Sequence, residues 1–377
     1  MLAVLLAAIT LIPHEVSLVD GRHFVLNLPP QYEVKVAAEG LRRVRFMAKA
    51  PDGRLFVTDM YNRTDNSRGK VYVLDGFDAK TGRFAHSTPY MSGLRNPNSV
   101  AFYTDESGAN WMYVALTDKL VRYRYTAGST QADGAPQVIA TFPAYGLDYK
   151  YGGWHLTRTI AIGPNRKTYV SVGSSCNACI EKEDVRAAVI EMSPDGSDRK
   201  FFATGLRNAV GLTFSGSQLF ATNMGADHLG DLAPLDTFYA LQSGADYGWP
   251  YCYVAANGKI TNDPRFPSKD KCDRVPKPFA TFPAHASPLG FTQIDNNTFL
   301  VALHGSSKKK LDHGYRVARV HNGHVEDFMT GFLANGKVIG RPADVFRLDD
   351  DTILVTDDYA GVIYAITSTG TRVKTQN

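Results

Sequence analysis

Short apolar or alternating runs recur along the chain, and each follows a polar turn rich in Asp, Asn and Gly. Such runs are typical of β-strands, and turns of this composition are typical of hairpins. The last positions of six runs are residues 57, 114, 170, 221, 301 and 355, with intervals of 57, 56, 51, 80 and 54 residues. A unit of about 55 residues holds four short strands, which is one propeller blade. The pattern therefore predicts an all-β fold, a six-bladed β-propeller.

The one long interval contains extra chain. Residues 250–278 hold five prolines together with Cys252 and Cys272. We expect an irregular insertion closed by its own disulfide, of the kind that borders a binding face. No linker or change of composition divides residues 20–377, whereas a set of separate β-sandwiches would show boundaries. A single propeller domain is thus expected over residues 14–377.

The N-terminal residues and the net charge limit the partners that the chain can have. The apolar run at 2–12 is about half the ~20 residues needed to span a bilayer, so residues 1–13 are interpreted as a truncated signal segment. The net charge is +4, from 41 basic and 37 acidic residues. This balance disfavours a nucleic-acid partner or a charged membrane surface as partner.

The four cysteines form two local pairs, Cys176 with Cys179 and Cys252 with Cys272. In an exported protein an even number of cysteines favours disulfides, so we expect two. The alternative, half of a zinc site at the first pair, lacks a second Cys-x-x-Cys or a suitable His spacing. The cysteines and the signal-like segment together predict a secreted or periplasmic protein.

Two segments carry candidate chemistry. An unperturbed imidazole such as that of His155 titrates near pH ~6.5 and can take a proton from a hydroxyl group, although a structural histidine is the simpler alternative. Arg207 and Asn208 lie between glycines in Gly-Leu-Arg-Asn-Ala-Val-Gly-Leu, where small neighbours let a ligand approach. An arginine binds carboxylates in a bidentate fashion, although this pair could also be an ordinary turn.

Three segments in this order resemble a known family: Gly-Gly-Trp-His at 152–155, the segment at 205–212, and Asp-Tyr-Gly-Trp-Pro at 246–250. They are similar to the soluble quinoprotein glucose/sorbosone dehydrogenases, β-propellers that bind pyrroloquinoline quinone (PQQ) and Ca²⁺ and oxidise sugars. The resemblance covers roughly residues 27–367. The sorbosone and pyranose dehydrogenase branch is the nearest, because of the segments at 93–99, 176–179 and 282–290.

The resemblance implies roles for individual residues. The catalytic base would be His155, and PQQ would be bound by Arg207, Asn208, Lys308 and Arg341. One Ca²⁺ would take carbonyl oxygens of Gly225 and Ala226. Candidates for a second Ca²⁺ are Asp236 and Tyr247.

Two features depart from the family pattern. The last cofactor segment of the family is roughly Gly-Arg-x-Arg-Asp-Val, and residues 340–345 here have Ala343 in place of the second arginine. The number of cations available for the cofactor carboxylates is therefore reduced. The cofactor lysine falls in a run of three, residues 308–310, from which Lys308 is chosen.

The sequence thus predicts a PQQ- and calcium-dependent dehydrogenase that oxidises an aldose, sorbosone or another pyranose-type sugar. Hydride would pass to the quinone, and a cytochrome or a quinone would accept the electrons. One alternative is a calcium-dependent propeller lactonase, which would need carboxylate or Asn metal ligands where this chain has arginine. The other is a secreted propeller that binds a glycan or protein without catalysis, an interpretation that Ala343 favours.

Overall fold

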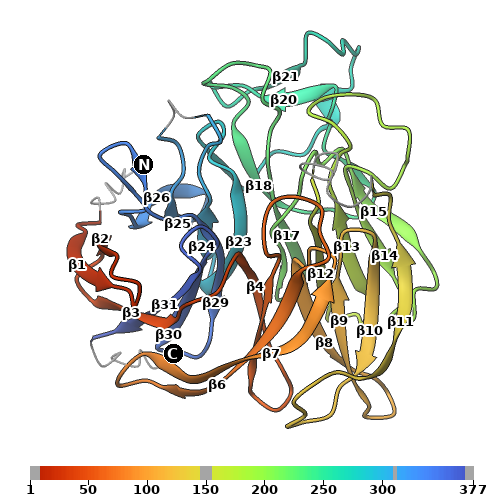
Figure 1. Ribbon diagram of the computed structural model, residues 1–377. Coiled ribbons are helices and arrows are strands. Elements are labelled where there is room, and N and C mark those ends of the chain that lie inside the picture. The colour runs from red at the N-terminus through yellow and green to blue at the C-terminus, as the bar shows by residue number, and fades with distance from the viewer. Residues whose placement is uncertain (1–8, 145–154, 309–311, 370–377) are drawn as a thin grey trace.

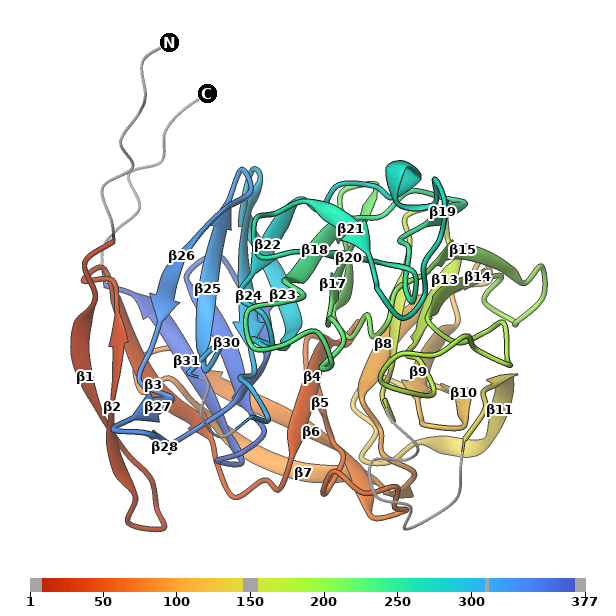
Figure 2. The same ribbon diagram turned by 90° about the horizontal axis from the view of Figure 1, so that it is seen from above.

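The computed structural model describes residues 9–144, 155–308 and 312–369. It forms a ring of six blades, each built from four antiparallel strands, and the chain passes once around the ring (Figures 1 and 2). The innermost strand of each blade contacts the innermost strand of the next. From the inside outward, the blades are β4 (Val44–Lys49), β5 (Leu55–Asp59), β6 (Gly69–Asp78) and β7 (Arg83–Leu94); β8 (Ser99–Thr104), β9 (Asn110–Ala115), β10 (Lys119–Arg124) and β11 (Asp133–Thr141); β12 (Arg158–Ile162), β13 (Thr168–Val172), β14 (Ala188–Met192) and β15 (Lys200–Thr204); β16 (Leu212–Ser215), β17 (Gln218–Asn223), β18 (Asp236–Ala240) and β22 (Ala280–Phe282); β23 (Pro288–Asp295), β24 (Thr298–Leu303), β25 (Arg316–His321) and β26 (His324–Met329); and β29 (Pro342–Arg347), β30 (Thr352–Asp357), β31 (Val362–Ser368) and β3 (Tyr32–Ala38).

The predicted six-bladed propeller is confirmed. Each of the six apolar runs is the second strand of its blade: β5, β9, β13, β17, β24 and β30. These strands are almost entirely buried, because each lies between neighbouring strands and between adjacent blades. This burial explains why the second strands gave the strongest hydrophobic signal.

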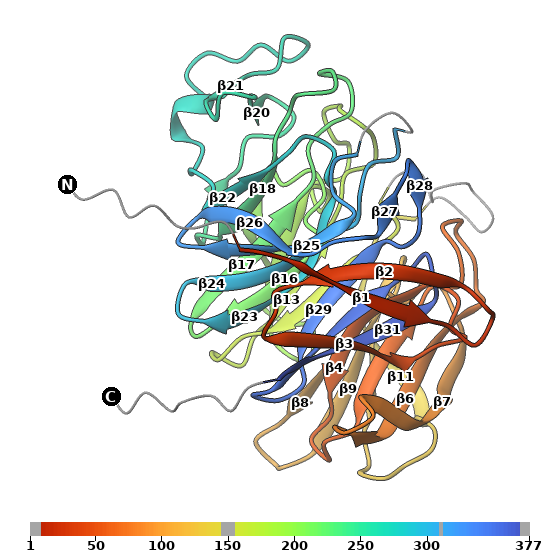
Figure 3. The same ribbon diagram turned by 90° about the vertical axis from the view of Figure 1, so that its left-hand side faces the viewer.

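The two ends of the chain close the ring together. The N-terminal strand β3 pairs antiparallel with β31, from Tyr32 opposite Ser368 to Ala38 opposite Ile363. The sixth blade therefore combines three C-terminal strands with one N-terminal strand. A hairpin of β1 (Ile12–Ser17) and β2 (His23–Leu28) crosses the outside of the ring (Figure 3). The proposed signal segment thus lies partly in β1 and partly in residues 1–8, outside the described residues.

The predicted insertion lies between β18 and β22, on the rim of the fourth blade (Figure 1). It holds β19 (Ala245–Asp246), which pairs with β15, then β20 (Cys252–Val254), β21 (Ile260–Asn262) and the 3₁₀ helix η1 (Cys272–Arg274). A short hairpin, β27 (Leu333–Ala334) with β28 (Lys337–Val338), precedes β29. The described residues contain no helix long and apolar enough to cross a membrane.

Both predicted cysteine pairs are joined, Cys176 to Cys179 and Cys252 to Cys272. The second pair closes a loop with a sequence separation of 20 residues. We expect the Cys252→Ser/Cys272→Ser variant to lose about 2–4 kcal/mol of unfolding free energy, because the unfolded chain gains freedom. Denaturant unfolding of the two proteins measures the loss. An unchanged unfolding midpoint would contradict a stabilising role for this disulfide.

Candidate active site

The predicted site residues gather at one mouth of the central channel. Neighbouring strands of a blade are antiparallel, so the loop before the innermost strand and the loop between the second and third strands lie at the same end. The first kind of loop carries His155, Arg207, Asn208 and Arg341; the second kind carries Gly225, Ala226 and Lys308. Below them, all six innermost strands line a cavity of about 430 Å³.

His155 has the protonation state of a general base. Its Nδ1 lies 3.0 Å from both the carbonyl oxygen and the hydroxyl of Ser174, and that hydroxyl donates to the Cys176 carbonyl at 2.7 Å. A carbonyl only accepts, so Nδ1 carries the proton and Nε2 carries the lone pair. Burial, followed by the charge of Arg207, holds the pKa of His155 well below its usual range. The imidazole is therefore neutral at neutral pH.

Arg207 is buried, at 4% exposure, and is held by neutral groups. Its Nε donates to the Asn177 carbonyl at 2.8 Å, one terminal nitrogen donates to the Asn177 side chain at 3.0 Å, and the other donates to the Gly225 carbonyl at 2.8 Å. Burial lowers the pKa of Arg207. A buried guanidinium held mainly by neutral acceptors is well suited to bind an anion.

A glycine lies between the histidine and Asn208. A Cβ at Gly173 would lie 2.5 Å from Oδ1 of Asn208 and 2.6 Å from Cβ of His155. Real side chains do not approach so closely, so only glycine lets these two residues lie side by side. The amide nitrogen of Asn208 also contacts the Met224 sulfur at 3.4 Å. The structure therefore brings together the two motifs at 155 and 207–208.

Asp227 and His285 belong to the same cluster, and neither was predicted from the sequence. Asp227 lies 3.7 Å from the Arg207 guanidinium and 3.2 Å from Nδ1 of His285. Nε2 of His285 lies 2.7 Å from the carbonyl of Gly230. Lys308 reaches that same carbonyl at 3.2 Å and pairs with Asp231 at 2.9 Å. Lys308 is therefore connected to Arg207 through His285 and Asp227, whereas Lys309 and Lys310 lie outside the described residues.

Three of the four candidate calcium residues, Gly225, Asp236 and Tyr247, form hydrogen bonds within the protein. Asp236 is buried, which raises its pKa to about 6, and its two oxygens accept the backbone N–H groups of Gly225 and Ser287 at 2.7 and 2.8 Å. The Tyr247 hydroxyl accepts the backbone N–H of Gln242 at 2.9 Å. Ala226 is buried beside them. Each Asp236 oxygen accepts one N–H bond and keeps a further lone pair, so the carboxylate remains able to bind a cation.

Arg341 fixes the loop between β24 and β25. Its guanidinium donates to the carbonyl oxygens of residues 304, 305 and 306 and to the Tyr315 hydroxyl, at 2.8–3.2 Å, and lies over the Tyr315 ring. Among the described residues, four bonds thus involve its two terminal nitrogens. Arg341 would therefore contact a bound ligand through its Nε, or through its terminal nitrogens once these four bonds had rearranged.

A second buried charge group joins the first, fifth and sixth blades. Asp358 pairs with Arg43 at 3.2 Å, Arg45 at 2.9 Å and His304 at 2.8 Å. Arg45 also donates to the Asn98 side chain at 3.0 Å. Asp358 and its three partners come from three blades that are far apart in the sequence, and they meet because these blades are neighbours in the closed ring. No local motif signals them.

The floor of the mouth is apolar. Phe46, Val210, Leu289 and Ala343 form one buried cluster, against which Met224 packs. Ala343, which replaces the expected arginine, is 0% exposed. A side chain at this position points into the cluster, so the alanine is explained by close packing.

Replacing Ala343 with arginine is expected to destabilise the protein by about 1–3 kcal/mol, because the longer side chain overpacks the cluster. Denaturant unfolding of Ala343→Arg measures the effect. Wild-type stability together with tighter PQQ binding would show instead that position 343 can reach the ligand.

The pairing of His285 predicts a pH dependence of stability. The hydrogen bond to Asp227 is the largest cause of the raised pKa of His285, and both ring nitrogens face oxygen acceptors. Because the pKa of His285 is higher in the folded protein than in the unfolded chain, protonation of His285 stabilises the folded protein. This stabilisation is complete below the unfolded pKa of about 6.5 and is lost as pH rises through the folded pKa. We expect the free energy of unfolding of Asp227→Asn to fall less than that of the wild type as pH rises above about 6.5. Denaturant unfolding of both proteins over this pH range measures the difference. An identical pH dependence in both proteins would contradict the assignment.

The fold is that of a six-bladed β-propeller, with a cluster of charged residues at one end of its axis. Residues 26–352 match the family model described as TrAA12-like, and the chain belongs to this family. An uncharacterized protein of Borreliella burgdorferi is 24% identical over 96% of this chain and 94% of its own length.

Two solved structures share the fold. The holo form of the PQQ domain of pyranose dehydrogenase from Coprinopsis cinerea superposes with a TM-score of 0.75 at 19% identity, covering 91% of this chain and 97% of that one. A calcium structure of the carbohydrate-active family AA12 protein from Trichoderma reesei gives 0.75 at 16% identity, covering 91% and 96%.

Proposed function

We propose that this protein is a PQQ- and calcium-dependent dehydrogenase that oxidises an aldose, sorbosone or another pyranose-type sugar. Membership of the TrAA12-like family supports this proposal. The observation that carries it is the pairing, across Gly173, of a neutral, half-buried histidine with an Arg-Asn pair whose arginine keeps its charge.

The residues at the mouth fit a PQQ molecule, which carries three carboxylates. Within the described residues, three of the five N–H groups of Arg207 donate to protein acceptors, so two remain for a carboxylate. Lys308 supplies a second cation, and Asn208 supplies an amide. Arg341 would hold the cofactor only through the part of its guanidinium that the loop does not use.

The fit to Ca²⁺ rests on carbonyl oxygens, which are ligands that this ion prefers. The Gly225 oxygen accepts one bond from Arg207 and keeps a second lone pair for a cation. Ala226 would add its own oxygen, and the Asp227 carboxylate beside them would lower the electrostatic cost of a cation. Asp236 would contribute the remaining lone pairs of its carboxylate to a second ion, and Tyr247 would contribute an oxygen.

When bound, PQQ would supply a two-electron acceptor, and Ca²⁺ would supply positive charge beside it. Nε2 of His155 would take the proton of the sugar hydroxyl. The Nδ1–H bond to Ser174 would stabilise the imidazolium that forms. The apolar floor would exclude water from below the reacting groups.

The two disulfides support a location outside the cytoplasm, which we propose to be the periplasm or the extracellular medium. A soluble cytochrome or a quinone would then be the electron acceptor. No motif in the sequence identifies which sugar is oxidised.

A lactonase would need several oxygen ligands around a metal. Among the described residues, the one group of three His, Cys, Asp or Glu side chains close enough to hold a metal is Cys176, Cys179 and Glu181. Two of these are joined in a disulfide, so no observation favours this alternative.

Turnover measurements test the proposal. Protein incubated with PQQ and Ca²⁺ should reduce an artificial acceptor dye when supplied with aldoses or other pyranoses, and should do so far more slowly without either cofactor. Hydrolysis of a sugar lactone by protein without PQQ would support the lactonase instead. Sugar binding without dye reduction by the PQQ-loaded protein would support the non-catalytic propeller.

A further inference from the structure

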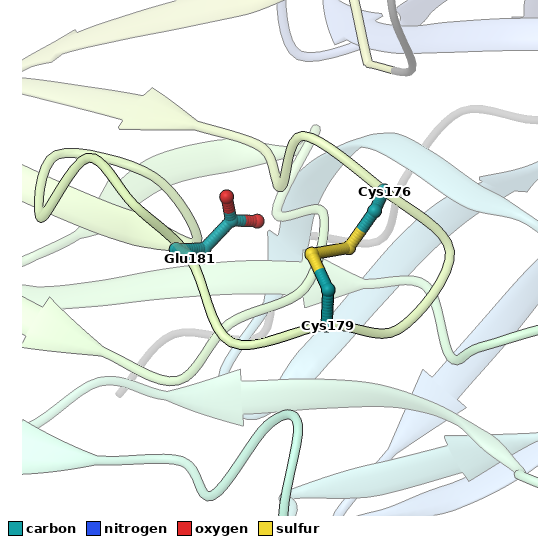
Figure 4. A group of neighbouring side chains, drawn as sticks. All are labelled: Cys176, Cys179 and Glu181. Atoms are coloured by element: carbon teal, nitrogen blue, oxygen red, sulfur yellow. A yellow bond between two sulfur atoms is a disulfide. The ribbon is translucent and has the colours of Figure 1, made fainter.

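A short disulfide ring lies directly beside Arg207. The Cys176–Cys179 bond closes a four-residue loop between β13 and β14, with Glu181 next to it (Figure 4). Asn177 lies inside this ring and binds the arginine with both of its oxygens. Its Oδ1 also accepts the backbone N–H of Asp227 at 2.8 Å. One residue of the ring therefore fixes two members of the charged cluster.

The chemistry of this contact is unusual for a buried arginine. Asn177 binds the Nε and one terminal nitrogen, which is an edge that a carboxylate can bind in bidentate fashion. Asn177 is neutral, and the Gly225 carbonyl on the other nitrogen is neutral as well. The carboxylate paired with Arg207 is that of Asp227, at 3.7 Å and 42% exposed. Arg207 is thus held in place by hydrogen bonds to neutral acceptors, and its ion pair with Asp227 is long and partly exposed.

The ring also supports His155. The Ser174 hydroxyl donates to the Cys176 carbonyl, and Ser174 in turn accepts the Nδ1–H group of His155. On the other side of the ring, Ser175 donates its backbone N–H and its hydroxyl to the Glu181 carboxylate at 2.7 and 2.6 Å. Residues 174–177 therefore hold the histidine and the arginine from one short segment.

We propose that Asn177 is a positioning residue: fixed by the Cys176–Cys179 disulfide, its neutral amide orients Arg207 and preserves the charge of Arg207 for an anionic group of the cofactor. This inference rests on the proposed function for the identity of the anion. The orientation of Arg207 by Asn177 does not depend on it.

Titration calorimetry with PQQ in the presence of Ca²⁺ tests whether the neutral charge of Asn177 matters for cofactor binding. Asn177→Asp has nearly the same shape but adds a negative charge beside Arg207, so we expect PQQ to bind at least about tenfold more weakly. Asn177→Ala should also weaken binding, by a smaller factor. Asn165→Ala is the matched control, because Asn165 lies in the turn between β12 and β13 at the opposite end of the blade. Wild-type affinity in Asn177→Asp would overturn the proposal.

The positioning of Arg207 by Asn177 is tested in protein without cofactor. We expect the Arg207 Nε–H group, assigned in ¹⁵N spectra with the help of Arg207→Lys, to exchange with solvent at least about tenfold faster in Asn177→Ala than in the wild type. Equal exchange rates would overturn the positioning role even if PQQ binds. Slow, Asn177-dependent exchange in a wild-type protein that does not bind PQQ would leave positioning intact and reject the proposed cofactor.

The role of the ring is tested with a pair of double variants. Cys176→Ser/Cys179→Ser should speed the exchange of the Arg207 Nε–H and weaken PQQ binding about tenfold, whereas Cys252→Ser/Cys272→Ser should do neither. Circular dichroism verifies that both variants keep the β fold. Equal effects of the two double variants would overturn the role of the ring.

Discussion

Replacing His155 with alanine is expected to lower sugar turnover by about 10²-fold or more, the usual contribution of a positioned base. The reason is the loss of Nε2, the nitrogen left unprotonated by the Nδ1–H bond to Ser174. PQQ binding should change little, because the cations of the mouth remain. Steady-state kinetics of the PQQ-loaded variant, with loading verified by absorbance, measures the effect.

His86→Ala is a suitable control, because this histidine is 70% exposed and pairs with Asp75 on the first blade. It should turn over at the wild-type rate. Wild-type turnover by a fully loaded His155→Ala protein would remove His155 from the reaction.

Replacing Arg207 with leucine is expected to raise the dissociation constant of PQQ about tenfold or more, which corresponds to at least ~1.4 kcal/mol. The variant loses the guanidinium and leaves the oxygens of Asn177 and Gly225 without their donor. The blade strands do not depend on these bonds, so the β fold should persist. Titration calorimetry together with circular dichroism separates the two effects.

Arg166→Leu is the corresponding control, since Arg166 lies in the turn before β13 and bonds the Tyr103 hydroxyl at the other end of the propeller. Its affinity for PQQ should equal that of the wild type. A similar loss in both variants would mean that general charge, and not Arg207, governs binding.

Much of the fold was predictable because a propeller repeats one local rule. In each blade an Asp-, Asn- or Gly-containing turn leads into the second strand, which is almost entirely buried, and both features are visible in the sequence. The closure of the ring by β3 was not predictable, because β3 has no local feature that identifies its partner strand. Its partner β31 lies more than 300 residues away, and no local pattern encodes that pairing.

The site was predictable in part, for a related reason. A motif identifies residue types, and the motif residues His155, Arg207 and Lys308 do lie at one mouth of the central channel. Motifs do not show where hydrogen bonds go, so the bonds that engage the side chains of Asp236 and Tyr247 were missed. Asn177 was missed as well, although it lies inside the recognised Cys-Asn-Ala-Cys segment.

The central claim is that this mouth binds PQQ with the help of Ca²⁺. Titration calorimetry of the wild-type protein with PQQ, in the presence of Ca²⁺ and again with a chelator, tests it most directly. The account predicts saturable binding of one PQQ per chain that weakens strongly when the chelator removes Ca²⁺. Absence of PQQ binding by folded protein in the presence of Ca²⁺ would contradict the dehydrogenase assignment and favour a propeller that binds a glycan or protein without catalysis.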